Sequence, residues 1–117
     1  MKFISPKLHG IIDFVVVLFL LASPMLFGMN GFLAIFTYAL GLVHLALTLL
    51  TDFNAGVIKV IPLPIHGVIE LIVGIALMVL AFTLFKDSGT GKLYYSCFGA
   101  AVLLTWLFTD YKAPKNQ

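Results

Sequence analysis

Four long runs of apolar residues, separated by short polar stretches, set the pattern along the chain. The runs cover 8–27, 32–51, 65–85 and 93–110. A run of about 20 apolar residues can cross the ~30 Å hydrocarbon layer of a membrane as an α-helix. Only 28–31 separate the first two runs and 86–92 the last two, so each pair should form an antiparallel helical hairpin. The pattern predicts an all-α, integral membrane four-helix bundle built from two tandem transmembrane hairpins.

Helix breakers divide the chain into segments. Gly56, Pro62 and Pro64 lie among apolar residues between the two hairpins, which predicts an interfacial linker that runs along the membrane surface. The first run carries the polar residues His9 and Asp13, so we expect it to be retained as a span and not cleaved as a secretory signal. The expected segments are a first hairpin over 1–55, the linker over 56–64, a second hairpin over 65–111 and a polar tail over 112–117.

The two hairpins repeat each other in sequence. Leu8-His-Gly-Ile-Ile-Asp13 matches Ile65-His-Gly-Val-Ile-Glu70 at an offset of 57 residues. Leu50-Thr-Asp52 matches Phe108-Thr-Asp110 at an offset of 58. Each unit holds an even number of spans, so both copies should have the same orientation. Their pseudo-two-fold axis should then run along the membrane normal.

Composition supports a membrane protein and excludes several other classes. Hydrophobic residues make up 62% of the chain and charged residues only 10%, too few to coat the surface of a soluble enzyme. The net charge of +2 is too small for a nucleic-acid binder. The single cysteine, Cys97, excludes a disulfide framework. The expected partners are the lipid bilayer and further copies of the chain, because a four-helix bundle leaves a large apolar surface.

The lysines predict the orientation in the membrane. An even number of spans places both termini and the linker on one side, together with five of the seven lysines; the two sets are Lys2, Lys7, Lys59, Lys112 and Lys115 against Lys86 and Lys92. Lysines are enriched in cytoplasmic loops. We therefore expect a multi-pass protein with both termini in the cytoplasm.

A short motif near the end of the first run suggests a family. Ser23-Pro-Met25 in a two-span unit resembles the SPW-repeat proteins, a family of small bacterial membrane proteins, with methionine where the family has tryptophan. The second unit has Phe82-Thr-Leu84 there and lacks the Ser-Pro pair. The resemblance implies a protein of the bacterial inner membrane and supplies no catalytic residues.

The polar residues of the runs gather at the predicted cytoplasmic end. His9 and Asp13 are four residues apart, as are His66 and Glu70, so each pair shares one helix face. The helices that return to this end bring Thr51, Asp52, Thr109 and Asp110. In a mainly structural role, each histidine would offset the unfavourable charge of the aspartate that ends the neighbouring helix, and so latch its own hairpin. That role needs no enzyme activity and is our leading interpretation.

Two functional alternatives use the same residues. His9, Asp13, His66 and Glu70 offer two nitrogens and two carboxylates to a divalent ion such as zinc or iron, and two histidines at matched depth also suit a haem, although less well so close to water. A proton-coupled transporter or channel is the other alternative. His44 breaks the repeat, because Val102 stands at its counterpart, and it is a further member of the polar cluster.

Overall fold

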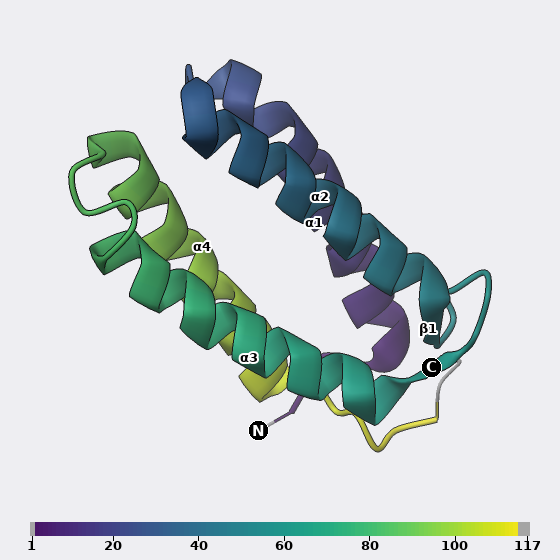
Figure 1. Cartoon of the computed structure of the whole chain (residues 1–117). Helices are drawn as coiled ribbons and strands as arrows, with labels where there is room; N and C mark the ends of the chain where they lie inside the picture. Colours follow the sequence, from purple (N-terminus) through teal and green to yellow (C-terminus); the bar gives the residue numbers. More distant parts are fainter. Residues whose placement is uncertain (1, 115–117) are drawn as a thin grey trace.

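Four α-helices make up most of the computed structural model, which describes residues 2–114 (Figure 1). They are α1 (Pro6–Leu26), α2 (Gly31–Leu50), α3 (Leu63–Phe82) and α4 (Gly89–Phe108). Helix α1 packs against α2 and α3 against α4, which confirms the all-α class and the two hairpins. Helices α1, α2 and α3 are each long and apolar enough to cross a membrane. Residues 115–117 of the predicted tail lie outside the described residues.

Side-chain caps set where two of the helices begin. The Leu8 amide donates to Ser5 Oγ at 3.2 Å before α1, and the Gly91 amide donates to Ser88 Oγ at 3.0 Å before α4. These hydrogen bonds satisfy amides that a helix start leaves unpaired. Helix α4 therefore begins at Gly89, earlier than the apolar run that predicts a start at 93. Helix α3 also ends earlier than its apolar run, at Phe82, so the connection lies at 83–88 and not at 86–92. An apolar run reports the lipid-facing length of a helix and not its capped end.

The turn between α1 and α2 depends on two glycines. Gly28 and Gly31 adopt φ angles of +63° and +57°. Residues with a Cβ rarely adopt this left-handed conformation, so glycine lets the chain reverse within a few residues.

Short parallel strands join the two hairpins at one end of the molecule. Strand β1 (Thr51–Asp52) follows α2 and pairs with β2 (Ile61–Pro62), which precedes α3; Thr51 lies opposite Ile61. Ile4 and Thr109 form the same parallel bridge between the start of α1 and the end of α4. The end of each hairpin thus pairs with the start of the other. The predicted linker over 56–64 runs from the turn after β1 through β2 into the first turn of α3.

Hydrogen bonds from α4 join the hairpins again at the opposite end. Tyr95 Oη lies 2.6 Å from Thr37 Oγ1 of α2, and the Tyr94 hydroxyl donates to Ser23 Oγ of α1 at 2.7 Å. Leu20 and Leu77, which are equivalent in the two repeats, are buried beside these tyrosines. Figure 1 shows the hairpins as two arms that meet where the linker, the start of α1 and the end of α4 lie.

Candidate functional site

Two histidines and two acids come together inside the end of the molecule where the strands pair. His9 and Asp13 lie one turn apart on α1, and His66 and Glu70 lie one turn apart on α3. All four side chains are buried. The structure therefore brings together the four residues that the sequence predicts as metal ligands, and we call them the His/carboxylate cluster.

The distances show that the cluster converges on one point. Glu70 Oε1 lies 2.9 Å from His9 Nε2 and 3.0 Å from His66 Nε2. Asp13 lies between the same two nitrogens, with Oδ1 3.3 Å from His9 Nε2 and Oδ2 3.2 Å from His66 Nε2. One ligand atom from each residue can be chosen so that all four lie within 4.8 Å of one another.

Two threonines fix which ring nitrogen of each histidine carries a proton. His9 Nδ1 lies 2.8 Å from Thr109 Oγ1, and His66 Nδ1 lies 2.7 Å from Thr51 Oγ1. Each threonine hydroxyl already donates its single proton to the carbonyl oxygen four residues earlier in its helix, at 2.6 Å in both cases. The hydroxyl oxygens must therefore accept, and both Nδ1 atoms must donate. The Nε2 atoms of both histidines are left to face the carboxylates.

These contacts correct the predicted latch. The histidines were expected to hold their own hairpins through Asp52 and Asp110, but His9 on α1 binds the threonine that ends α4, and His66 on α3 binds the threonine that ends α2. The crossed strand pairing causes this, because it places the end of each hairpin against the start of the other. The latch therefore holds one repeat to the other.

The aspartates that follow the two threonines have other roles. Asp110 Oδ1 accepts a hydrogen bond from the Lys112 amide at 3.0 Å, and its own amide donates to the Ile4 carbonyl at 2.9 Å. Asp52 lies in β1, opposite Pro62. Both aspartates therefore take part in the backbone pairing at the helix ends.

His44 is the third histidine near the cluster. It lies on α2 with Nε2 3.5 Å from Asp13 Oδ1, too far for a strong hydrogen bond. Among the described residues, neither His44 Nε2 nor Asp13 Oδ2 has a hydrogen-bond partner. The structure thus adds His44 to the edge of the cluster, next to Asp13.

Tyr111 is a member of the site that the sequence analysis missed. Its hydroxyl donates to Glu70 Oε2 at 3.0 Å, and its ring lies over Gly67, where a Cβ would come within 3.0 Å of Cζ. Burial, and then the negative charge of Glu70, raise the pKa of Tyr111. Phe53 is its counterpart in the first repeat, with its ring centre 5.4 Å from that of His66. The signal was present, because each aromatic residue directly follows a Thr-Asp pair.

Two interruptions of the repeat make the carboxylates unequal. Glu70 has the Tyr111 hydroxyl beside it, whereas Asp13 has His44, since Phe53 has no hydroxyl and Val102 occupies the second-repeat position of His44. The site is therefore two-fold symmetric in its histidines and asymmetric around its acids.

Comparisons of the chain with protein-family models, with curated proteins and with solved structures gave no match. The geometry of the site is therefore the only basis for a functional proposal.

Proposed function

We propose that this chain is a four-span membrane protein whose His/carboxylate cluster binds one divalent transition-metal ion. Helix α4 would be the fourth span, since it pairs with α3 in the same way that α2 pairs with α1. Zinc and iron suit a mixed set of imidazole and carboxylate ligands.

The observation that carries the proposal is the orientation of the two imidazoles. Because each Nδ1–H donates to a threonine hydroxyl, the neutral imidazoles carry a lone pair on Nε2. Both Nε2 atoms face the same oxygen, Glu70 Oε1. A lone pair facing a carboxylate is unfavourable unless a cation lies between them. A metal ion supplies that cation, and histidine ligands in proteins almost always donate their other ring N–H to a fixed partner.

The carboxylates have the supporting contacts that a metal site needs. The Tyr111 hydroxyl donates to Glu70 Oε2, the oxygen that faces away from the histidines, and so leaves Oε1 for an ion. Two carboxylates balance the charge of a divalent ion, so the buried site would be neutral.

A second candidate is a purely structural latch, with a proton on each Nε2 in place of a metal ion. The distances of 2.9 Å and 3.0 Å from Glu70 Oε1 to the two Nε2 atoms also suit hydrogen bonds between imidazolium and carboxylate groups. The convergence of one ligand atom from each of four buried residues within 4.8 Å supports the metal. The aliphatic walls above the cluster give no specific support to a proton path.

Metal content separates the two candidates. We expect purified wild-type protein to hold one zinc or iron ion per chain by elemental analysis, and to lose thermal stability when a strong chelator removes it. Glu70→Gln should abolish binding. The matched control is Asp87→Asn, the same chemical change at an exposed acid outside the cluster.

A metal-free preparation that stays folded, takes up no added zinc or iron and is unaffected by the chelator would overturn the metal proposal. The structural latch would then be the remaining candidate. In that case Glu70→Gln should still lower the thermal stability, whereas Asp87→Asn should not.

A further inference from the structure

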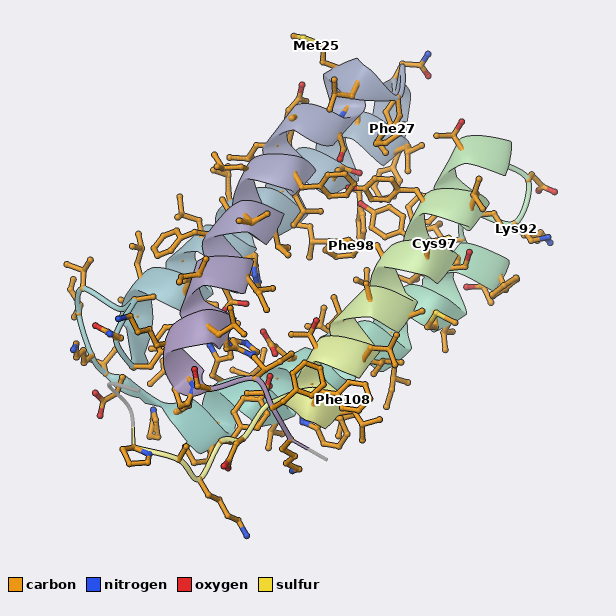
Figure 2. The ribbon with its side chains drawn as sticks, turned by 180° about the vertical axis from the view of Figure 1, so that it is seen from behind. Met25, Phe27, Lys92, Cys97, Phe98 and Phe108 are labelled. Carbon is orange, nitrogen blue, oxygen red and sulfur yellow. The ribbon has the colours of Figure 1, made fainter. Side chains whose placement is uncertain are left out.

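A cavity lies between the two hairpins, directly next to the His/carboxylate cluster. Its volume is about 100 Å³, and it is partly open to the surroundings of the protein. All four helices contribute aliphatic wall residues, among them Val16, Leu40, Val73 and Val102. Phe98 of α4 also lines it and lies between the two arms in Figure 2. Ligand pockets of proteins have this kind of lining, mostly apolar with a few polar groups.

Polar atoms occur at one end of this apolar space. Asp13, His44 and Glu70 line the cavity beside the cluster. Two buried atoms there, Asp13 Oδ2 and His44 Nε2, have no hydrogen-bond partner among residues 2–114. Buried polar atoms nearly always make hydrogen bonds. Within that range, Asp13 Oδ2 has only the ion-pair contact with His66 at 3.2 Å, and His44 Nε2 only the 3.5 Å contact with Asp13, so a further molecule can complete the site.

The cavity can be reached from the side of the bundle. Val43 of α2 lines it and is 65% exposed, so the cavity extends to the outer surface of the helices. In a membrane-spanning bundle that surface faces the lipid chains. A molecule that enters here therefore comes from the bilayer, and its body must be apolar to match the walls.

We infer that this cavity binds the hydroxyl end of a membrane-soluble alcohol or phenol, with the hydroxyl at Asp13 and His44 and the rest of the apolar body leaving through the open side of the cavity. A hydroxyl both donates and accepts. It can donate to the Asp13 carboxylate and also pair with His44 Nε2, which lies 3.5 Å from Asp13 Oδ1. An anionic lipid head would be repelled by the Asp13 and Glu70 carboxylates in the same lining. This inference goes beyond the metal proposal and does not require a bound ion.

Photolabelling of the full-length protein in lipid vesicles tests the inference. The probe is dodecanol with a diazirine in its chain, and the matched probe is its methyl ether, which can accept but cannot donate. We expect the alcohol to label the cavity-lining residues at least about tenfold more than the ether does, because the ether leaves the Asp13 carboxylate unpaired. Peptide mapping should place the label on α1, α2, α3 and α4 at wall positions.

A pair of neighbouring variants controls for the walls. Val16→Phe fills the cavity and should remove most of the labelling by the alcohol, whereas Val15→Phe, at a residue that is 60% exposed on the same helix, should not. Helix content measured by circular dichroism shows whether each variant folds. If Val16→Phe fails to fold, Val102→Phe fills the same space from α4.

Three results would overturn the inference: equal labelling by alcohol and ether, label spread over the exposed faces of the helices, or equal losses in Val15→Phe and Val16→Phe. Labelling is repeated after chelation. Retained labelling in metal-free protein supports the cavity even if the metal proposal fails, and bound metal without selective labelling supports the metal proposal alone.

Discussion

Thr51 and Thr109 each accept a hydrogen bond from a histidine Nδ1 while donating their own proton to a carbonyl of the preceding helical turn. A hydroxyl bound on both sides in this way holds the imidazole in one tautomer and one orientation. The threonines therefore determine which nitrogen faces the carboxylates, although neither would contact an ion itself.

Replacing one of these hydroxyls should weaken metal binding without removing a ligand. We expect Thr109→Val to lower the affinity for zinc about 10–100-fold, the usual effect of losing the partner that orients a histidine ligand. Competition with a chelator of known affinity measures the change. The control is Thr83→Val, which removes a similar hydroxyl-to-carbonyl hydrogen bond on the exposed far end of α3. Equal affinities in both variants would contradict the orienting role.

The Tyr111 contact predicts how stability depends on pH. The raised pKa of Tyr111 means that the unfolded chain loses this proton near the ordinary value of about 10, while the folded chain keeps it. The Tyr111 contact should therefore make its full contribution to the free energy of unfolding below pH ~10, and this contribution should fall as the pH rises above that value.

Thermal unfolding followed through the fluorescence of Trp106 measures this fall. It should be shallower in Tyr111→Phe, which has no proton to lose, than in wild type. Tyr38→Phe, at an exposed tyrosine of α2, should behave like wild type. An unchanged slope in Tyr111→Phe would show that other groups cause the pH dependence.

At the scale of the elements, small residues allow the two helices of each hairpin to pack closely. Gly99 on α4 lies against α3, where a Cβ would come 3.0 Å from Met78 Cγ and 3.2 Å from the Gly74 carbonyl oxygen and the Met78 amide. Gly41 occupies the equivalent place on α2, against Leu21 of α1. Backbone atoms cannot move away as a flexible side chain can, so Gly99 is the more tightly constrained of the two.

We expect Gly99→Ala to reduce stability by ~1–3 kcal/mol, the usual cost of an extra methyl group in a close-packed site. Gly89→Ala is the matched control, because the space around its Cβ is open and alanine is the better helix former. Thermal unfolding in detergent should show a lower midpoint for Gly99→Ala and an equal or higher one for Gly89→Ala. Equal midpoints would mean that α3 and α4 can separate at little cost.

The helices themselves could be predicted from apolar runs because a span needs a minimum apolar length. Their ends could be predicted less well, as α4 shows with its start at Ser88–Gly89 and not at 93. The strand pairs could not be predicted, since two-residue strands have too little sequence to show a period. Their alignment depends on helices that are distant in the chain.

At the scale of the whole molecule, the fold places the two hairpin turns at one end and the linker, the start of α1 and the end of α4 at the other (Figure 1). If all four helices cross the membrane, Asn30 and Asp87 lie on one side and Lys59 and Lys112 on the other. Location in the bacterial inner membrane, cytoplasmic termini and assembly with further copies stay predictions. The resemblance to the SPW-repeat family stays one too.

Cysteine labelling tests the number of crossings. The exposed Cys97 is first replaced by alanine, and single cysteines are then introduced by Asn30→Cys, Asp87→Cys, Lys59→Cys or Lys112→Cys. A membrane-impermeant maleimide added to one side should label the first two together and the last two together. If Lys112→Cys is instead labelled together with Asp87→Cys, α4 does not cross and the four-span proposal fails.

The sequence by itself determined the hairpins and the helix face that each histidine shares with its acid, because apolar run length and the four-residue spacing of His9–Asp13 and His66–Glu70 are local properties. Only the tertiary structure decided that the two repeats latch each other, that Tyr111 supports Glu70, and that a cavity begins beside Asp13. His9 and Thr109 are 100 residues apart in the chain. The spacing along one helix shows which residues share a face. The hydroxyl that holds each histidine in one tautomer, however, comes from the end of the other hairpin, and only the packing of the two hairpins brings it there.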